Sequence, residues 1–291
     1  MKVTVKAHAK LNLTLDIIGK RDDDYHLLES VMQSVSLHDL VTVRKVGGSE
    51  ITVSTSDESI ADDQSNIAYR AAEAFFEATG IPRTGIEIKI KKNIPTGAGM
   101  AGGSADGAAV IIAMNEIFET GLDTERMCDI GGEVGADIPF CISGGTMMAR
   151  GTGSILAPLP DMPDCWFVIA KPECSVSTAE AYRAVDRHGD NFAHPDSETM
   201  CEDICSQDIA AIARGLCNVF EQVLDLPDVA SIRQVMLDAG ALGACMTGSG
   251  SAVFGIFTDK DAADDCVSLL ERSYDDVFSA QPVSCGCETD L

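Results

Sequence analysis

The sequence predicts an α+β protein, because strand patterns and helix patterns both occur along the chain. Residues 3–17 and 86–91 alternate apolar and polar side chains, which is typical of half-buried strands. Residues 108–118 are apolar on nearly every side, as in a buried helix. A third feature, the proline-rich segment 158–163, indicates that these elements are divided between two domains.

The proline-rich segment is the best domain boundary, with three prolines in six positions. It separates an N-terminal domain over residues 1–158 from a C-terminal domain over residues 159–291. A chain of 291 residues suits one large α/β domain or two modest ones, and it can bury a core. No apolar run approaches the roughly 20 residues of a membrane span. The strand pattern begins at the N-terminus and leaves no room for a signal peptide, so we expect a cytoplasmic protein.

Further elements are predicted from apolar spacing and turn residues. Gly47 and Gly48 separate two strand-like runs, 40–46 and 51–54, which predicts a hairpin. A helix over 66–79 begins at Ser65 or Asn66 and ends at Gly80. The rest is predicted as a helix over 123–134, strands over 146–150 and 166–170, mainly helices over 178–240 with an irregular polar stretch at 188–200, strands over 244–246 and 252–257, and a polar tail over 284–291.

The net charge of -25 argues against a general binder of nucleic acid or of anionic membranes. The charge is unevenly spread: residues 1–99 hold 12 Lys/Arg and 14 Asp/Glu, whereas residues 100–291 hold 9 and 32. An anionic ligand is therefore best tolerated by the N-terminal third. The basic residues there include Lys6, Lys10, Lys20, Arg21, Lys89, Lys91 and Lys92.

The cysteines are an odd set of 11 without a CxxC pair. Cys201 and Cys205, and likewise Cys285 and Cys287, lack the spacing of a zinc site, and the five histidines are scattered. We therefore expect reduced thiols, mostly buried as small apolar residues, and no metal site built from them.

A glycine-rich loop over residues 95–106 lies between the alternating strand and the buried helix. Without a Cβ, glycines let backbone N–H groups approach an anion, and the following helix aims its positive dipole end at the same place. The loop lacks the Gly-Lys-Ser/Thr of a Walker A motif and the spacing of a dinucleotide fingerprint. A phosphate-binding loop is therefore predicted, with a flexible linker as the alternative.

On the polar face of the first strand, Lys10 and Asn12 stand two positions apart and point the same way, roughly 7 Å apart. From the spacing alone, an ordinary strand lysine at the rim of a sheet is the favoured interpretation of Lys10. A polar face this long nevertheless suggests that part of it does more than meet water.

Three blocks in a fixed order, Lys10-Leu11-Asn12, the loop 95–106 and Gly248-Ser249-Gly250, resemble the GHMP small-molecule kinases. The strings 19–30 and 135–140 resemble the branch of that superfamily that phosphorylates a cytidine diphosphate-linked methylerythritol in isoprenoid precursor biosynthesis. The resemblance covers most of residues 1–180 and returns at 240–257. It implies a ribosomal-protein-S5-like N-terminal domain and a ferredoxin-like C-terminal domain.

The resemblance also implies the reaction, ATP and Mg²⁺ as cofactors, and roles for single residues. Asp137 would be the base that accepts the substrate proton, although by sequence it could be a turn or cap residue. Lys10 would stabilise charge on the transferred phosphoryl group. Ser104 would reach the phosphates or Mg²⁺, although it also suits a helix N-cap.

Binding residues follow from the same resemblance. The loop residues expected to hold ATP are Pro95, Thr96, Gly97, Ala98, Gly99, Met100, Ala101, Gly102, Gly103, Ser104 and Ala105. The residues expected to bind the substrate are Asn12, Tyr25, His26 and Tyr182, with the two tyrosines and the histidine at the cytosine. Asn66 and Ile67 are expected near the adenine. The chain departs from the family pattern at Asp24, where glycine is usual, at Ala105, where a second serine often follows, and at Ser154, where an acidic residue is common.

Two alternatives stay open. One is a sister kinase for another small alcohol such as mevalonate or homoserine, against which the Tyr25-His26 pair argues. The other is a catalytically silent relative that senses a nucleotide, against which Lys10, Ser104 and Asp137 argue. A small-molecule substrate, no nucleic acid or membrane partner, and a monomer or weak homodimer are expected.

Overall fold

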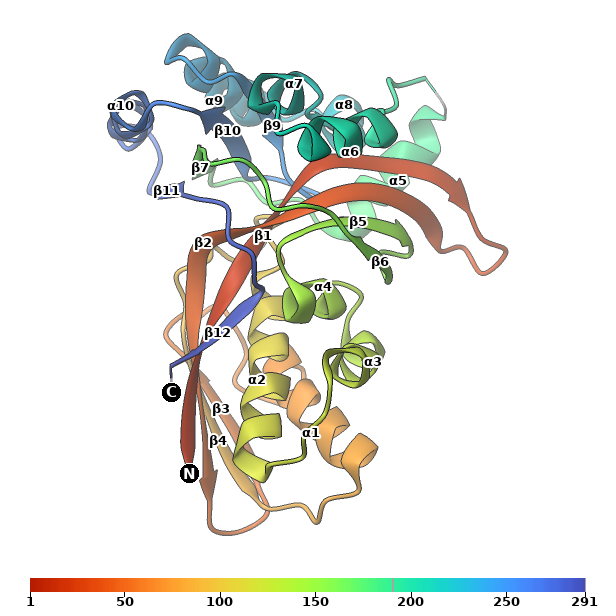
Figure 1. Cartoon of the computed structure of the whole chain (residues 1–291), viewed down its shortest axis with the longest axis vertical. Coiled ribbons are helices and arrows are strands. Elements are labelled where there is room, and N and C mark those ends of the chain that lie inside the picture. Colours follow the sequence, from red (N-terminus) through yellow and green to blue (C-terminus); the bar gives the residue numbers. More distant parts are fainter. Residues whose placement is uncertain (190, 291) are drawn as a thin grey trace.

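The computed structural model describes residues 1–189 and 191–290, which are organised around two β-sheets (Figure 1). The first sheet has eight strands, and five of them follow the order β12-β1-β2-β4-β3. Its strands are β1 (Lys2–Lys20), β2 (His26–Val46), β3 (Ile51–Thr55), β4 (Gly85–Lys91), β5 (Thr146–Gly151), β6 (Ile155–Pro158), β8 (Cys217–Asn218) and β12 (Cys287–Asp290).

The long strands β1 and β2 pair antiparallel along nearly their whole length and run through both halves of the molecule (Figure 1). The apolar face of β1 is buried as its alternation predicted. Its polar face is also buried in the middle, where Lys10 is 5% exposed and Asn12 is not exposed at all. This strand therefore lies inside the protein, and its polar side chains must find partners there.

The predicted hairpin between residues 40–46 and 51–54 is wrong. β4 lies between the two runs: it pairs antiparallel with β2 and parallel with β3. A parallel pair needs a crossover connection, which helix α1 (Ile67–Thr79) supplies between β3 and β4. Gly47 and Gly48 do separate the two strands β2 and β3 along the chain. They do not determine which strand pairs with β2.

Four helices pack on the first sheet and on one another: α1, α2 (Gly102–Phe118), α3 (Thr124–Val134) and α4 (Ile138–Ser143) (Figure 1). The predicted limits of α1 are confirmed, because the Asn66 side chain accepts from the N–H of Ala68 and Gly80 takes a φ of 66°. The apolar helix α2 lies between the sheet and the other helices, which explains why nearly all of its faces are buried.

The second sheet has four antiparallel strands in the order β11-β7-β10-β9, with two helices against it. These elements are β7 (Trp166–Lys171), β9 (Gly243–Met246), β10 (Val253–Phe257), β11 (Asp276–Ala280), α9 (Pro227–Asp238) and α10 (Lys260–Leu270). The predicted helical region holds α5 (Thr178–His188), α6 (Ser197–Cys205), α7 (Ile209–Arg214) and α8 (Val219–Val223). Among the helices of the described residues, none combines the length and apolar character needed to cross a membrane.

The predicted polar tail over 284–291 is wrong for residues 287–290, which form strand β12. This strand pairs antiparallel with the edge of β1, placing Glu288 opposite Lys6 and Cys287 opposite Ala7. The edge of β1 would otherwise expose unpaired backbone groups, so a short polar segment can act as a strand there. The end of the chain thereby returns to the first sheet (Figure 1).

Candidate active site

One cavity of about 470 Å³ collects most of the residues singled out from the sequence. The residues that line this cavity come from segments that are far apart in the chain. They include Lys10, Asn12, Ile67, residues 95–103, Asp137, Tyr182 and residues 248–250. Ser104, Ala105, Tyr25 and His26 are not among its lining residues.

The glycine loop is held by backbone contacts on two sides. The N–H of Lys10 donates to the carbonyl of Met100 (3.2 Å), and the N–H of Ala252 donates to the carbonyl of Ala98 (3.2 Å). Gly99 has a φ of 76°, and a Cβ there would lie 2.2 Å from the Thr247 carbonyl oxygen. Only glycine fits such a position. The two glycine-rich loops of the chain therefore touch each other through their backbones.

Helix α2 begins directly after this loop, with Ala101 at its N-cap position in the left-handed region (φ 57°). Its first turn leaves the N–H groups of Gly102, Gly103 and Ser104 without intrahelical partners, because the first helical bond runs from Ala105 to Ala101. The alternative interpretation of Ser104 as the N-cap is wrong, since it lies inside the first turn. These free donors and the helix dipole make an anion site.

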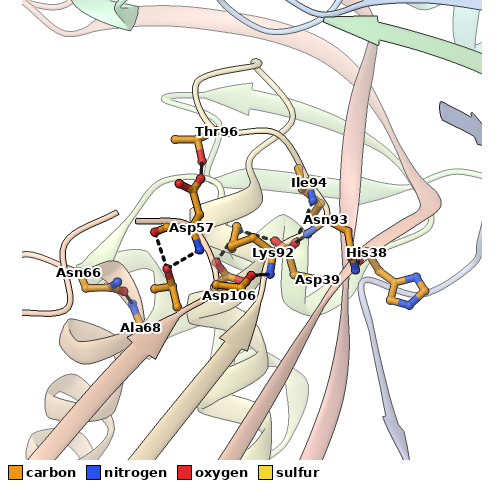
Figure 2. A network of polar contacts seen from close by, with 12 residues as sticks. His38, Asp39, Asp57, Asn66, Ala68, Lys92, Asn93, Ile94, Thr96 and Asp106 are labelled. Carbon is orange, nitrogen blue, oxygen red and sulfur yellow. Dashed lines mark hydrogen bonds and ion pairs between the residues drawn. The ribbon is translucent and has the colours of Figure 1, made fainter. Parts of the chain in front are cut away.

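A buried charge cluster lies beneath the loop, as Figure 2 shows. The Lys92 ammonium forms ion pairs with the carboxylates of Asp39 and Asp106, at 2.7 Å from Asp106. Asp39 also accepts from the backbone N–H groups of Asn93 (2.6 Å) and Ile94 (2.9 Å). Strand β2, the segment between β4 and the loop, and helix α2 are thus tied together by one cation and two carboxylates.

The surroundings of this cluster alter the protonation of its members. Burial raises the pKa of the Asp106 carboxyl to about 7, against the opposing pull of Lys92. Burial acts to lower the pKa of Lys92, but the carboxylates of Asp106 and Asp39 outweigh it and raise that pKa. Lys92 therefore stays charged beside the loop.

Sequence reasoning listed Lys92 only among the basic residues and missed its two partners. The sequence did contain a signal for this burial. Ile86, Ile88 and Ile90 are buried at every second position, and Lys92 stands at the next position of the same alternation. Asp106 likewise is a charged residue within the apolar stretch 105–114 of α2. A charge at an apolar position predicts a buried partner.

The far side of the loop is joined to the connection before α1. Thr96 Oγ1 donates to Asp57 Oδ2 (2.9 Å; Figure 2). Asp57 also accepts from the N–H and the hydroxyl of Ser59. Asn66, expected near the adenine, uses its side chain to cap α1 (Figure 2). Thr96 and Asn66 both line the cavity.

Lys10 and Asn12 are brought together as their shared face predicted. Lys10 Nζ donates to Asn12 Oδ1 (2.6 Å), and the same oxygen accepts from the N–H of Gly248 (3.0 Å). Asn12 Nδ2 donates to Ser30 Oγ (2.8 Å). In this arrangement the Asn12 amide links the Lys10 ammonium to the loop 247–251, a connection that sequence reasoning did not foresee.

Asp137 lies at the N-cap position of α4, but its side chain makes no capping hydrogen bond. Asp137 thus holds the turn and cap position that the alternative interpretation gave it, but its carboxylate is not used as a cap and borders the cavity. Burial, together with the Asp137 carboxylate, raises the pKa of Tyr182 across the cavity. Lys10 and Asp137 thus border the same space.

Of the residues expected at the cytosine, Tyr182 lines the cavity and His26 lies against it. His26 stacks on Tyr182, with ring centroids 4.6 Å apart and an interplanar angle of 22°. His26 Nε2 donates to Asp186 Oδ1 (2.7 Å), and Lys20 Nζ donates to Asp186 Oδ2 (3.0 Å). Tyr25 is 65% exposed. His26 at the start of β2 and Tyr182 on α5 therefore form a pair of stacked rings, and His26 adds a ring nitrogen.

The departures from the family pattern have local explanations. Asp24 has a φ of 66°, the left-handed conformation that favours glycine, and its carboxylate lies 3.3 Å from Lys20 Nζ. Ala105 is fully buried in the core, where a serine hydroxyl would need a partner. Ser154 lies within hydrogen-bond distance of Thr152 (3.3 Å between hydroxyls).

Comparisons with known proteins agree with this architecture. The GHMP kinase N-terminal domain matches residues 66–145, and the GHMP kinase C-terminal domain matches residues 200–276. Proteins named 4-diphosphocytidyl-2-C-methyl-D-erythritol kinase are 40% identical in Alkaliphilus metalliredigens, covering 97% of both chains, and 37% identical in Clostridium tetani, covering 96% of this chain and 99% of the relative.

Solved structures give the same picture. A 4-(cytidine 5'-diphospho)-2C-methyl-D-erythritol kinase superposes with a TM-score of 0.77 at 30% identity, covering 97% of this chain and 99% of the other. A homoserine kinase from Cytophaga hutchinsonii superposes with a TM-score of 0.80 at 20% identity, covering 99% and 97%, and shares the fold. The protein has the two-domain α+β fold of the GHMP kinases, and the chain belongs to their 4-diphosphocytidyl-2-C-methyl-D-erythritol kinase family.

Proposed function

We propose that the protein transfers the γ-phosphoryl group of ATP to the 2-hydroxyl of 4-diphosphocytidyl-2-C-methyl-D-erythritol, a step in isoprenoid precursor biosynthesis. The observation that carries this proposal is one cavity bordered by the glycine loop, Lys10, Asp137 and Tyr182. The family membership of the chain supports the substrate. The hydroxyl oxygen forms the new bond to phosphorus, the bond from the γ-phosphorus to the bridging oxygen breaks, and ADP leaves.

The glycine loop and the start of α2 would hold the ATP phosphates through backbone N–H groups, with Lys92 as a nearby fixed positive charge. Mg²⁺ would be held by Ser104, whose hydroxyl oxygen suits a cation that prefers oxygen ligands and is not used as a helix cap. In kinases this ion neutralises charge on the phosphate oxygens. Positioning and charge neutralisation are the main contributions to such a reaction.

Asp137 would accept the proton of the attacking hydroxyl, since its carboxylate borders the cavity and makes no capping hydrogen bond to α4. Lys10 would stabilise the charge that develops on the transferred phosphoryl group. Asn12 makes hydrogen bonds to Lys10, Gly248 and Ser30. It would contact the substrate by replacing one of these bonds with a hydrogen bond to the substrate.

The cytosine would be bound by His26, Tyr25 and Tyr182. With its Nε2–H bonded to Asp186, a neutral His26 keeps a lone pair on Nδ1, which can accept from the exocyclic amino group of cytosine. The rings of Tyr25 and Tyr182 supply stacking surfaces. The His26–Tyr182 stack supports this role, because it already presents a flat aromatic surface beside the cavity.

The experiment that tests the proposal measures ADP release with three candidate acceptors. The cytidyl substrate should be phosphorylated, whereas mevalonate and homoserine should not. Activity with mevalonate or homoserine instead would favour a sister kinase, and ATP binding without turnover of any acceptor would favour a silent relative. The division into domains 1–158 and 159–291 remains a prediction, which limited proteolysis would test. The monomer or weak homodimer also remains a prediction, which light scattering would test.

A further inference from the structure

A second group of polar side chains lies where the end of the chain meets the first strand, outside the cavity described above. His8 on β1, Cys285 before β12 and Glu288 on β12 offer a nitrogen, a sulfur and an oxygen atom that all lie within 4.8 Å of one another. The strand pairing brings them together, because the N–H of His8 donates to the carbonyl of Gly286 (2.9 Å).

The protonation of His8 is set by its other ring nitrogen. His8 Nδ1 lies 3.1 Å from the carbonyl oxygen of Val35, which can only accept, so Nδ1 carries the hydrogen. In the neutral ring Nε2 then has a bare lone pair. Histidines that bind metals typically donate their second nitrogen to a carbonyl or carboxylate in this way.

The lone pair of Nε2 is buried and lacks a hydrogen-bond partner within the part of the chain that the structure describes. His8 is only 4% exposed, so water does not readily replace a partner. Nε2 faces Glu288 Oε1 at 4.0 Å, and this oxygen lies 3.8 Å from Cys285 Sγ. Two groups that accept hydrogen bonds therefore face each other, an arrangement that a cation between them would stabilise.

We propose that His8, Cys285 and Glu288 bind a divalent cation of the zinc type, with a fourth position open to water. Zn²⁺ accepts nitrogen, sulfur and oxygen ligands together, whereas Mg²⁺ and Ca²⁺ prefer oxygen alone. Tetrahedral bonds of the usual lengths place ligand atoms about 3.3–3.8 Å apart. The two separations that involve Glu288, 4.0 and 3.8 Å, need only a small contraction, and His8 and Cys285, within 4.8 Å of each other, would close by up to about 1 Å.

The neighbours of the site leave the three ligand atoms available. Lys6 Nζ donates to Glu288 Oε2 (3.0 Å) and leaves the other carboxylate oxygen, Oε1, for the metal. Cys285 donates its weak S–H to the same Oε1 and would lose this proton to solvent on binding. The bound ion would attach the C-terminal strand to β1 and take no part in phosphoryl transfer.

The test titrates the reduced, chelator-treated full-length protein with Zn²⁺ by calorimetry and with Co²⁺ by absorption spectroscopy. We expect one Zn²⁺ per chain and a thiolate-to-cobalt absorption band. Cys285→Ser and Glu288→Gln should each weaken binding at least ten-fold, and Cys285→Ser should abolish the band. The matched control is Cys205→Ser, which changes an exposed cysteine of α6 outside the cluster and should leave both readouts unchanged.

Two further readouts do not depend on spectroscopy. Zn²⁺ should slow alkylation of Cys285 but not of Cys205, as measured by mass spectrometry, and should raise the melting temperature of the wild type but not of Cys285→Ser. A wild type that binds no Zn²⁺ at micromolar to millimolar concentrations would overturn the proposal. Equal loss of binding in Cys205→Ser and Cys285→Ser would also overturn it, by assigning the ion to surface thiols.

Discussion

The two ends of the cavity are built by different means. At the proposed phosphate end, backbone N–H groups and glycines form the surface, and the buried cluster of Lys92, Asp39 and Asp106 supports it from below. At the proposed cytosine end, Tyr182 lines the cavity and His26 stacks on it from outside the lining, and the partly exposed Asp186 binds His26 and Lys20.

The difference follows from what each end would bind. Phosphate oxygens are recognised by fixed dipoles and charge, which are strongest where water is excluded. A base is recognised by stacking and by hydrogen bonds from side chains, which tolerate a more exposed and adaptable surface. Substitutions at the phosphate end should therefore cost stability as well as function, whereas those at the cytosine end should change substrate binding alone.

The largest effect is expected between the two ends, at Asp137. Asp137→Asn removes the proposed base while keeping its size, so kcat should fall by at least about 10²-fold. ATP affinity, measured by calorimetry, should stay nearly intact. Asp129→Asn on α3, which changes an exposed carboxylate paired with Arg126, serves as the control. Near-normal turnover in the Asp137→Asn variant would contradict the assignment.

At the phosphate end, Lys92→Met should destabilise the protein by about 3–5 kcal/mol, because it leaves two buried carboxylates without their cation. Lys89→Met on the preceding strand β4 is the matched control: Lys89 is 61% exposed and pairs loosely with Glu87, so it should cost less than about 1 kcal/mol. Urea denaturation measures both. Equal stability of the two variants would show that the cluster does not support the loop.

At the cytosine end, His26→Ala should raise KM for the cytidyl substrate about ten-fold or more and leave KM for ATP nearly unchanged, since a base that loses its partner is bound less tightly. CDP should inhibit the wild type and lose potency against this variant. His188→Ala, which changes an exposed histidine of α5, is the control. If CDP inhibits His26→Ala and wild type equally, the base is held elsewhere.

The smallest effect is expected at Asp24. Asp24→Gly relieves a left-handed backbone and removes a surface pair with Lys20, and the two contributions oppose each other. The free energy of unfolding should change by at most about 1 kcal/mol, and KM for both substrates should stay within two-fold. A large rise in KM for the cytidyl substrate would instead assign Asp24 a direct part in binding.

Features that depend on neighbouring residues could be predicted from the sequence. The limits of the helix after Asn66 follow from a cap and a stop glycine, and the glycine loop follows from its place between a strand and an apolar helix. The convergence of Lys10 and Asn12 followed from the two-residue period of a strand. In each case the physical cause lies within a few residues of the feature.

Features that depend on distant residues were decided by the tertiary structure. The strand beside β2 is β4 and not β3, because helix α1 allows a parallel crossover. Likewise Lys92 meets Asp39 across 53 positions, and Asn12 meets Gly248 across 236. Apolar spacing determines which face of an element is buried, but many partners can bury the same face. Only the packed chain, in which each buried polar group must be paired, selects among them.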